Sequence, residues 1–419
     1  MDILDDLRFR GLLYQVTDEE ELASRLKSGP ITLYIGFDPT ADSLHVGSLL
    51  PILGLRRFQL AGHKPIPLVG GGTGLIGDPS GKTSERSLNP VELINTWTGK
   101  IRLQLERFLD FDTKVNPAQM ANNYEWLGNV PFITFLRDIG KYFSLNTMLA
   151  KDAVKSRLDT GISFTEFSYV ILQSYDFLKL YEKYNCELQA GGSDQWGNIV
   201  SGIDLIRKVT NKKAYGLTFP LVTKEDGTKF GKTEAGTIWL DRDKTSPYQF
   251  YQFWINADDG DVMKYINYFT FLPHAEIRSL EEEVRNNSGK REAQRVLAKE
   301  VTALVHGPEA QAKAEKISRA LFYGNIKELA EDELEEALQD VPSVEVRDKG
   351  ELNIVDLLLL CGAAPSKRQA RQDIRNGAIY INDQCVKDAQ AVLPQAQRLW
   401  EKYLVVRRGK KNYFLTKWF

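Results

Sequence analysis

The sequence predicts an α/β protein whose first domain is built on a parallel sheet. Residues 31–37 and 64–70 are short apolar segments with β-branched side chains, bounded by Gly or Pro, which is typical of buried strands. Residues 46–61 between them predict a helix, so the three segments form one β–α–β crossover. The same order returns after residue 164, and repeated crossovers build a parallel sheet with ligands at the carboxyl ends of its strands.

Individual elements of this domain carry their own signals. Pro51 falls in the second turn of the helix over 46–61, where it removes one backbone hydrogen bond and favours a kink. The second crossover consists of a helix over 164–184, a strand over 186–190 and another helix after Gln195.

The pattern changes twice beyond this domain. From 246 to 325 the strand signals fade, and Ala, Glu, Lys and Leu at helical spacing predict a helical domain. Residues 328–340 contain seven acidic side chains and few aromatics, which is typical of a solvated helix or a linker. The chain therefore divides into five predicted parts, 1–222, 223–245, 246–325, 326–350 and 351–419.

Composition excludes several classes of protein. A length of 419 residues corresponds to about three domains, and 42% hydrophobic with 26% charged residues is ordinary globular composition. The apolar run over 357–364 is far shorter than the roughly 18 residues of a membrane span, and the acidic first residues have the wrong sign for a secretory signal. Three scattered cysteines and four histidines argue against a disulfide scaffold or a structural metal. We expect a soluble, cytoplasmic protein.

Charge is unevenly distributed along the chain. The net charge is −2, but residues 351–419 carry 12 Lys and Arg against 6 Asp and Glu, so that segment has a net charge of +6 and the first 350 residues −8. A basic tail on an acidic body favours a polyanion as the partner of the tail; a basic surface without a partner is the alternative.

A glycine-rich segment, residues 70–86, follows the second predicted strand. Its six glycines indicate close approach of the backbone to another group. The segment contains a G-x-G-x-x-G, but the Asp78-Pro79 that follows would break the helix that a dinucleotide fingerprint opens, and its spacing is one residue short of a Walker loop. Lys82 and Arg86 offer two cations for phosphates, unless the segment is a plain surface loop.

The segment 38–48 runs from a predicted strand end to a helix start, where free N–H groups and the positive end of the helix dipole favour phosphate. Thr40 and His45 can donate hydrogen bonds, and Gly47 lets a ring or a phosphate lie against the backbone. Taken alone, a histidine in this position is usually a helix cap.

Two further loops lie downstream. Residues 224–233 predict a turn and a basic loop in which Lys229 and Lys232 flank a Phe-Gly hinge that swings them onto a polyphosphate; a solvated hairpin is the alternative. Residues 191–198 again join a strand end to a helix, and Asp194 there is a natural N-cap or a ribose ligand.

One face of the helix over 164–184 is polar. Tyr169, Gln173 and Asp176 lie at positions i, i+4 and i+7 and so share that face. Polar groups on an inward face need a partner, and a bound amphoteric ligand supplies one.

Taken together, these motifs resemble a known family. H-V-G-S at 45–48 and K-F-G-K-T at 229–233, which begin 184 residues apart, resemble the two signatures of class I aminoacyl-tRNA synthetases. The segments around 68–82 and 191–198 are similar to the bacterial tyrosyl branch of that family, and 366–382 resembles a small RNA-binding domain shared with a ribosomal protein. Ser48 departs from the pattern, because the first signature usually ends in a second histidine.

The resemblance implies a domain plan and a reaction. It implies a Rossmann-like catalytic domain (1–222), a mobile lysine-rich signature loop and connector (223–245), an α-helical anticodon-recognition domain (246–325), an acidic linker (326–350) and a small α+β RNA-binding domain (351–419). The implied reaction joins tyrosine to the α-phosphate of ATP, releases pyrophosphate, and passes the tyrosyl group to the 3′-terminal adenosine of tRNA(Tyr). No protein nucleophile is needed, because preorganised donors stabilise the charge on the phosphates.

The resemblance also implies roles for individual residues. Phosphate-stabilising catalytic residues are Thr40, His45, Lys82, Arg86, Lys229, Lys232 and Thr233. Tyrosine-binding residues are Tyr34, Asp78, Tyr169, Gln173, Asp176 and Gln195. ATP-binding residues are Gly36, Asp38, His45, Gly47, Ser48, Gly192, Asp194 and Lys232. Expected tRNA contacts are Lys367, Arg368, Arg371, Arg407, Arg408, Lys410 and Lys411.

The implied partners are L-tyrosine, ATP, tRNA(Tyr) and a second copy of the chain, with the apolar stretch 126–143 and Phe164 as the expected interface. Mg²⁺ is expected to accompany ATP as a substrate, without a dedicated protein cage and without a tightly bound cofactor. Two rival hypotheses remain at this stage: a tryptophanyl-type synthetase, and a non-catalytic RNA-binding protein that kept the synthetase body.

Overall fold

The structure is a computed structural model, and it describes residues 2–80, 88–155, 157, 161–225, 230–233, 236–339, 341–347, 352–393, 395–409 and 412–419. The chain forms two compact units, residues 1–245 with 256–301 and residues 246–255 with 302–419. Of the predicted site residues, Lys82, Arg86, Lys229, Lys410 and Lys411 lie outside the described residues, as do the side chains of Lys232 and Thr233.

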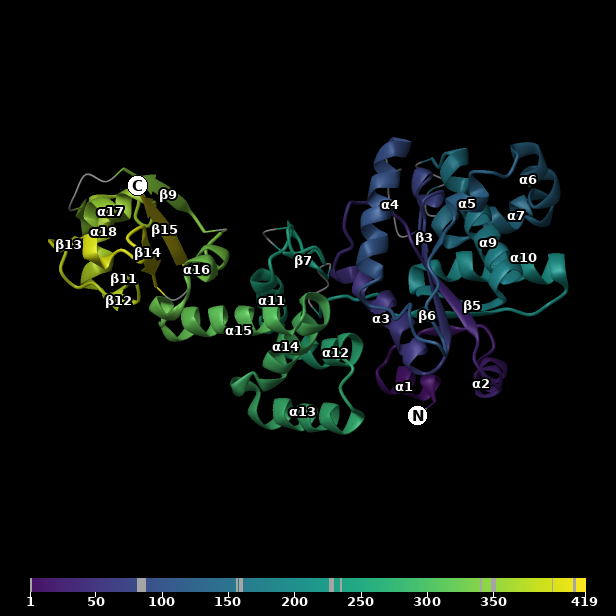
Figure 1. Ribbon diagram of the computed structural model, residues 1–419, viewed down its shortest axis with the longest axis horizontal. Coiled ribbons are helices and arrows are strands. Elements are labelled where there is room, and N and C mark those ends of the chain that lie inside the picture. The colour runs from purple at the N-terminus through teal and green to yellow at the C-terminus, as the bar shows by residue number, and fades with distance from the viewer. Residues whose placement is uncertain are drawn as a thin grey trace. The chain divides into compact units, whose positions relative to one another are not determined.

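The first unit is built on a six-stranded sheet of order β1-β6-β5-β2-β3-β4 (Figure 1). All neighbours pair in parallel except β1, which runs antiparallel to β6, so the predicted parallel sheet is confirmed. The strands are β1 (Gln15–Val16), β2 (Thr32–Phe37), β3 (Lys64–Val69), β4 (Ala121–Asn122), β5 (Cys186–Gly192) and β6 (Tyr215–Phe219).

Helices cover both faces of this sheet (Figure 1). α3 (Val46–Leu60) connects β2 to β3 and continues through Pro51, while α9 (Phe164–Tyr184) and α10 (Trp196–Thr210) pack together on the other face. α9 begins where Ser163 accepts a hydrogen bond from the Glu166 N–H, and it ends at Asn185, whose φ of 50° is left-handed. These local signals explain why the predicted and observed bounds of α9 agree.

The remaining elements of the first unit surround the sheet. Short helices and a small hairpin connect the strands, and three helices follow the hairpin. They are α1 (Ile3–Phe9), α2 (Glu19–Lys27), α4 (Val91–Leu105), α5 (Tyr124–Leu127), α6 (Phe132–Asp138), α7 (Leu145–Leu149), α8 (Asp152–Lys155), β7 (Lys232–Thr233), β8 (Gly236–Thr237), α12 (Asp259–Phe269), α13 (His274–Asn287) and the first part of α14 (Glu292–His306), a helix that the boundary between the two units divides after residue 301.

The strand order positions a crevice. The chain passes from β2 to β3 on one side, whereas β5 occupies the other side of β2. Ligands of open parallel sheets bind at such a reversal, outside the carboxyl ends of the two adjacent strands. The ends of β2 and β5 are therefore where a site is expected.

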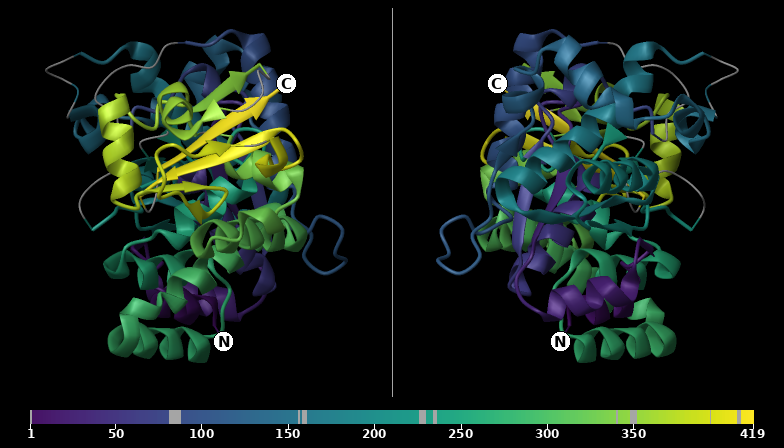
Figure 2. Two further views of the ribbon diagram at one scale, coloured as in Figure 1. Left: turned by 90° about the vertical axis from the view of Figure 1, so that its left-hand side faces the viewer. Right: turned by 90° about the vertical axis from the view of Figure 1, so that its right-hand side faces the viewer.

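The second unit contains a five-stranded sheet of order β12-β11-β14-β15-β9, yellow in the left-hand view of Figure 2. Its strands are β9 (Ser343–Val346), β11 (Ile379–Ile381), β12 (Gln384–Cys385), β14 (Tyr403–Arg408) and β15 (Asn412–Trp418), beside the small pair β10 (Leu352–Asn353) and β13 (Val392–Leu393). Its helices are α11 (Pro247–Ile255), α15 (Pro308–Tyr323), α16 (Glu331–Ala337), α17 (Ile354–Leu360) and α18 (Lys367–Arg375).

The segment 326–350, expected to be an acidic linker, is largely structured. β9 pairs in parallel with β15, and Leu334 on α16 is fully buried against Tyr403. Of the acidic residues of α16 only Glu333 is buried, and it accepts hydrogen bonds from Lys316 Nζ and the Ala330 N–H, so a high local charge does not prevent the helix from packing. The helices of 246–325 are likewise divided between the two compact units. Among the described residues, no helix is long and apolar enough to cross a membrane.

Candidate active site

A cavity of about 460 Å³ opens at the carboxyl ends of β2 and β5. Tyr34, Gly36 and Asp38 line it from β2 and the loop that follows, and residues 189–192 line it from β5. Gly36 is the one exposed residue of β2, and a Cβ atom there would meet no atom within 4 Å, so the strand surface is open to a ligand at this point. The cavity thus lies at the reversal of strand order, where a site is expected.

A buried carboxyl group closes one end of the cavity. Asp176 on α9 accepts hydrogen bonds from Asn123 Nδ2 at 2.9 Å and from Trp126 Nε1 at 2.7 Å. Burial raises the pKa of Asp176 to about 8, and the two hydrogen bonds oppose that rise because they stabilise the carboxylate.

Tyr34 lies beside this carboxyl group and has an unused hydroxyl. Its side chain is 1% exposed, and its Oη has no hydrogen-bond partner among the described residues. Burial, and then the charge of Asp176, raise the pKa of Tyr34 well above its usual value, so the phenol stays neutral. Gln189 lies opposite Tyr34 on the neighbouring strand β5, and its buried Oε1 also has no hydrogen-bond partner among the described residues. Such orphaned groups are rare and indicate a missing polar ligand.

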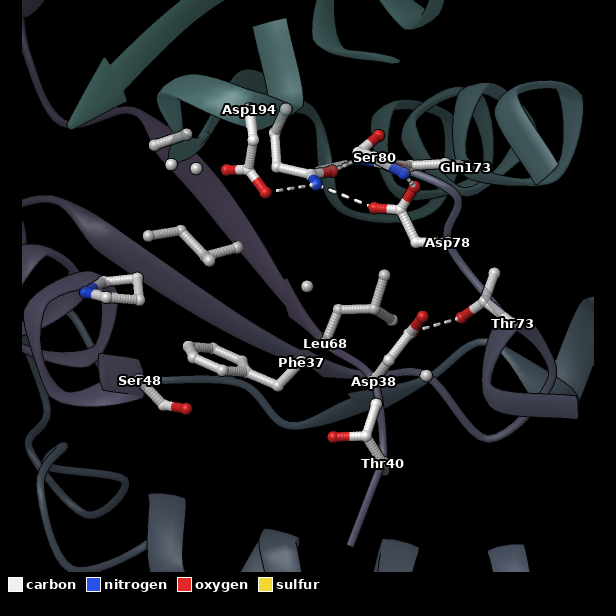
Figure 3. A pocket seen from close by; sticks show the side chains of 18 of the residues that line it. Phe37, Asp38, Thr40, Ser48, Leu68, Thr73, Asp78, Ser80, Gln173 and Asp194 are labelled. Carbon is white, nitrogen blue, oxygen red and sulfur yellow. Dashed lines mark hydrogen bonds between the residues drawn. The ribbon is translucent and has the colours of Figure 1, made fainter. Parts of the chain in front are cut away.

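A second network centres on Asp38 at the end of β2. Tyr169 Oη donates to Asp38 Oδ2 at 2.8 Å, and Thr73 Oγ1 donates to Asp38 Oδ1 at 2.7 Å (Figure 3). Asn123 Nδ2 also donates to Thr73 Oγ1 at 2.8 Å, which connects this network to Asp176. Gly70 is required here, because a Cβ atom would lie 2.0 Å from Asp38 Oδ1.

A third group faces Asp38 across the hollow (Figure 3). Gln195 Nε2 donates to Asp78 Oδ2 at 2.7 Å, and Gln173 Nε2 donates to Gln195 Oε1 at 3.2 Å. Gln173 Oε1 is buried without a partner among the described residues. Carboxylate and amide groups in this arrangement suit the ammonium and carboxylate of an amino acid.

The predicted polar face of α9 is confirmed as a pocket wall, because Tyr169, Gln173 and Asp176 all line the cavity. The expected N-cap role of Asp194 is wrong. Asp194 lies inside a short 3-10 turn over Ser193–Gln195, and α10 begins after Gln195, which makes no side-chain cap hydrogen bond. Asp194 instead points into the hollow near Gln195 (Figure 3).

The first signature forms the start of α3. His45 is the N-cap residue, and its Nδ1 accepts the Gly47 N–H at 3.0 Å, so in the neutral ring the proton is on Nε2. Thr40 and Ser48 line the same cavity, at the amino end of α3 (Figure 3). The cap and the binding role predicted for His45 are therefore compatible, since they use different ring nitrogens.

In the second signature, the ring of Phe230 has contacts with α12. Phe230 stacks on Phe269 with ring centroids 5.4 Å apart and lies 5.1 Å from Tyr265, both on α12. The Phe-Gly step is thus packed in the described structure, because its aromatic ring fills an apolar site on α12. Lys232 and Thr233 lie in β7, which pairs with β8.

Charge in the described lining of the cavity is negative. Four carboxyl groups line it and no Lys or Arg does, among residues 2–80, 88–155 and 161–225. The cations predicted for phosphate, Lys82, Arg86 and Lys229, lie outside the described residues. The described residues also hold no cluster of three or more His, Cys, Asp or Glu side chains that suits a metal ion.

Sequence reasoning missed several residues of the site. Asn123 and Trp126 hold Asp176, and Thr73 holds Asp38. Asn123 follows β4, a two-residue strand that is too short for a periodic signal. Nothing in the sequence indicated that Trp126 contacts Asp176 either, because an indole in an apolar stretch is equally typical of a core or of an interface.

The residues predicted to bind tRNA lie in the second unit. α18 buries Ala370 and Ile374 and exposes Lys367, Arg368 and Arg371 on its other side. Arg408 on β14 is 2.9 Å from Asp373, and Arg407 covers the ring of Tyr380 at 3.8 Å. Lys367, Arg368 and Arg371 are exposed, and of these Lys367 pairs with Asp356 at 2.8 Å. Arg407 and Arg408 also have partners within the unit.

The comparisons with known proteins agree with this geometry. The family model for class I tRNA synthetases (W and Y) matches residues 26–323, and the tyrosine–tRNA ligase SYY-like C-terminal domain matches residues 333–416. Tyrosine–tRNA ligases from Desulfitobacterium hafniense and Geobacillus stearothermophilus are 63% and 58% identical, over the whole of each chain.

Solved structures give the same result. A truncated mitochondrial tyrosyl-tRNA synthetase from Aspergillus nidulans has a TM-score of 0.70 and 31% identity, and the match covers 77% of this chain and 94% of that one. A tryptophanyl-tRNA synthetase from Encephalitozoon cuniculi shares the fold alone, with a TM-score of 0.56 and 16% identity over 80% of this chain and 90% of that one. From its signatures, its cavity and these matches, the chain belongs to the class I tRNA synthetases of the tryptophan and tyrosine group.

Proposed function

We propose that the chain is a tyrosine–tRNA ligase, which activates L-tyrosine with ATP to tyrosyl-adenylate and pyrophosphate and then transfers tyrosine to the 3′-terminal adenosine of tRNA(Tyr). The observation that carries the choice of tyrosine is the pair of Asp176 and Tyr34 at the closed end of the cavity. One is a buried carboxyl group held by two donors, and the other is a buried hydroxyl without a partner. A substrate phenol supplies the missing partner of the Tyr34 hydroxyl and a further donor to Asp176.

The same pair accounts for rejection of related amino acids. Phenylalanine carries no hydroxyl, so it would leave the buried Tyr34 hydroxyl without a partner and would bring no donor to the buried carboxyl group of Asp176. A site built to hydrogen-bond a substrate hydroxyl discriminates strongly for this reason. Tryptophan would bring a bulkier ring and a single N–H donor to a place where two hydroxyl-binding groups converge. The fold is common to both specificities, so the choice depends on these side chains.

The chemistry needs orientation and charge stabilisation. Asp78, Gln173 and Gln195 hold the α-ammonium side of tyrosine, which places its carboxylate toward the start of α3. There the positive end of the α3 dipole and the Nε2–H of His45 face the α-phosphate. Lys82, Arg86, Lys229, Lys232 and Thr233 supply the remaining donors to the phosphates. ATP arrives with Mg²⁺ as part of the substrate, without a dedicated protein cage for the ion.

A second copy of the chain is a further proposed partner. Six apolar side chains on α6, α7 and the start of α9 are between 41% and 72% exposed: Phe132, Ile133, Leu136, Leu145, Leu149 and Phe164. A surface this apolar is typical of a protein interface, and it overlaps the stretch predicted from the sequence. Sedimentation should show a dimer, and Ile133→Glu should shift it to monomer; a wild-type monomer would refute the interface.

For tRNA, the α18 cations Lys367, Arg368 and Arg371 supply salt-sensitive phosphate contacts. Because tRNA charging belongs to protein synthesis, we place the chain in the cytoplasm of its cell.

Pyrophosphate exchange tests the proposal. The purified chain should exchange pyrophosphate into ATP when tyrosine is present and not with phenylalanine or tryptophan at equal concentration. Exchange driven by tryptophan alone would replace the proposal with the tryptophanyl rival. Binding of tRNA without exchange by any of the three would establish the non-catalytic rival.

A further inference from the structure

We infer that Trp239, supported by Lys244 and Asp42, is a positioning residue that orients His45 and aligns the two signature segments. The inference rests on the proposed function, because the catalytic role of His45 does. Trp239 is absent from the described lining of the cavity, so it acts through His45 and not on the substrate.

The backbone brings the two residues together. Trp239 and His45 form an isolated antiparallel bridge. The Val46 N–H donates to the Ile238 carbonyl at 2.9 Å, and the Leu240 N–H donates to the Leu44 carbonyl at 2.9 Å. These two hydrogen bonds lie on either side of the pair, so Trp239 and His45 form a non-hydrogen-bonded antiparallel pair. In such pairs the two side chains lie closer together than in hydrogen-bonded pairs.

The rings then restrict each other. The indole of Trp239 meets the imidazole of His45 edge-on, with centroids 6.3 Å apart and an interplanar angle of 69°. On the other side of the imidazole, Nδ1 accepts the Gly47 N–H at 3.0 Å. Two contacts therefore set the direction of the His45 Nε2–H, the donor proposed to face the α-phosphate.

Trp239 is itself held by a charged support. The backbone N–H of Trp239 donates to Thr245 Oγ1 at 3.0 Å, and Lys244 Nζ lies 5.2 Å from the centroid of the indole ring. Lys244 Nζ is 2.6 Å from Asp42 Oδ1, and Asp42 Oδ2 is 3.0 Å from Lys100 Nζ. The support thus links α4, the loop before α3 and the segment after β8.

The same segment carries the second signature. The Ile238 N–H donates to the Gly231 carbonyl at 3.0 Å, which closes the β7–β8 hairpin. Gly231 has a φ of +77°, and a Cβ atom there would lie 2.6 Å from Val46 Cγ1. The hairpin with Lys232 therefore rests on the first turn of α3, and Trp239 stands where the two signatures join.

A double-mutant cycle separates positioning from general packing. Pyrophosphate exchange is measured for Trp239→Ala, His45→Ala and the double variant. We expect Trp239→Ala to lower kcat by roughly 10- to 100-fold, because misplacement by about 1 Å costs about that much, with KM for tyrosine unchanged. In the His45→Ala background the same change should cost less than about threefold, because the group it positions is gone. Trp239→Phe keeps an aromatic edge and should stay within about threefold of wild type.

The charged support has a matched control. Asp204 on α10 also lies between two cations, 2.6 Å from Arg207 and 2.7 Å from Lys208, and it does not line the cavity. Asp42→Asn should lower kcat by roughly threefold to tenfold through the loosened indole, whereas Asp204→Asn should leave kcat unchanged.

Two results would overturn the inference: an equal loss from Trp239→Ala with and without His45, or a wild-type kcat for that variant. Thermal denaturation shows whether Trp239→Ala folds. If it does not fold, the inference is tested by comparing Asp42→Asn with Asp204→Asn, and equal kcat values for these two variants would overturn it. Failure of wild-type exchange with tyrosine refutes the proposed function instead, so the two failures are distinguishable.

Discussion

Tyrosine binding should tighten as pH rises from 6 to 8, because the substrate hydroxyl donates to an ionised Asp176. Burial raises the pKa of that carboxyl to about 8 from 3.8. Only about 1% of the ligand-free protein then carries the carboxylate at pH 6, and about half does at pH 8. Because apparent affinity scales with the competent fraction, KM for tyrosine should fall about 50-fold over this range.

A second variant identifies the titrating group. Trp126→Phe removes the indole N–H that donates to Asp176 Oδ1 at 2.7 Å. A hydrogen bond to a charged group contributes about 1.5–3 kcal/mol, so the pKa of Asp176 should rise by about one to two units. The KM profile should move to higher pH by that amount, while any titration of the substrate itself stays in place.

The assay is pyrophosphate exchange at saturating ATP, with proton release on tyrosine binding measured by calorimetry in two buffers. Stability gives an independent check of the sign. Since the folded pKa lies above the unfolded value of 3.8, the free energy of unfolding of the ligand-free protein should fall as pH rises from about 4 to about 8. A KM that is constant from pH 6 to 8, or a Trp126→Phe profile with an unchanged midpoint, would refute the reasoning.

Three further predictions test other parts of the first unit. Tyr34→Phe should weaken tyrosine binding by up to about tenfold, yet keep or raise Tm in thermal denaturation, because it removes a buried hydroxyl without a partner. Arg157→Met leaves Glu166 buried without its partner at 3.0 Å, so urea denaturation should show a loss of about 3–5 kcal/mol. Gly70→Ala should lower kcat for exchange at least about tenfold by displacing Asp38, and unchanged kinetics would show that the loop yields to the added methyl.

Much of the fold could be predicted from the sequence, because local signals and tertiary packing agree there. β2 and β3 are continuous apolar segments, as expected for strands buried on both faces, and α9 is bounded by Ser163 and Asn185, which suit a helix start and end. The polar stripe of α9 was predicted from period alone, since a 21-residue helix leaves little freedom over which residues share a face.

The parts that the sequence did not predict depend on contacts between distant residues. Asn123 connects Asp176 to Thr73, residues that lie 53 and 50 positions away in the chain, and no local pattern contains that information. Residues 328–340 were predicted to form a solvated helix or a linker, and the helix α16 lies within them. The packing of this helix was not predicted, for a related reason. The acidic residues dominate its composition, whereas its packing depends on a few apolar side chains such as Leu334. Leu334 packs in a cluster with Tyr403, which lies far away in the sequence.

The described site separates recognition from phosphate chemistry. The groups proposed to bind the amino acid, Asp176 and Tyr34 above all, come from a helix and a central strand of the first unit. Both side chains are buried, and Asp176 is held by hydrogen bonds from Asn123 and Trp126. A specificity pocket needs such support, because a buried polar group discriminates only where it cannot move to find another partner. The cations predicted for phosphate are not among the side chains that the structure describes, and the carboxyl groups in the described lining of the cavity make it acidic. Trp239 matters in this arrangement because it connects the second signature to the rigid start of α3, and so sets the phosphate donors by the same framework that selects the substrate.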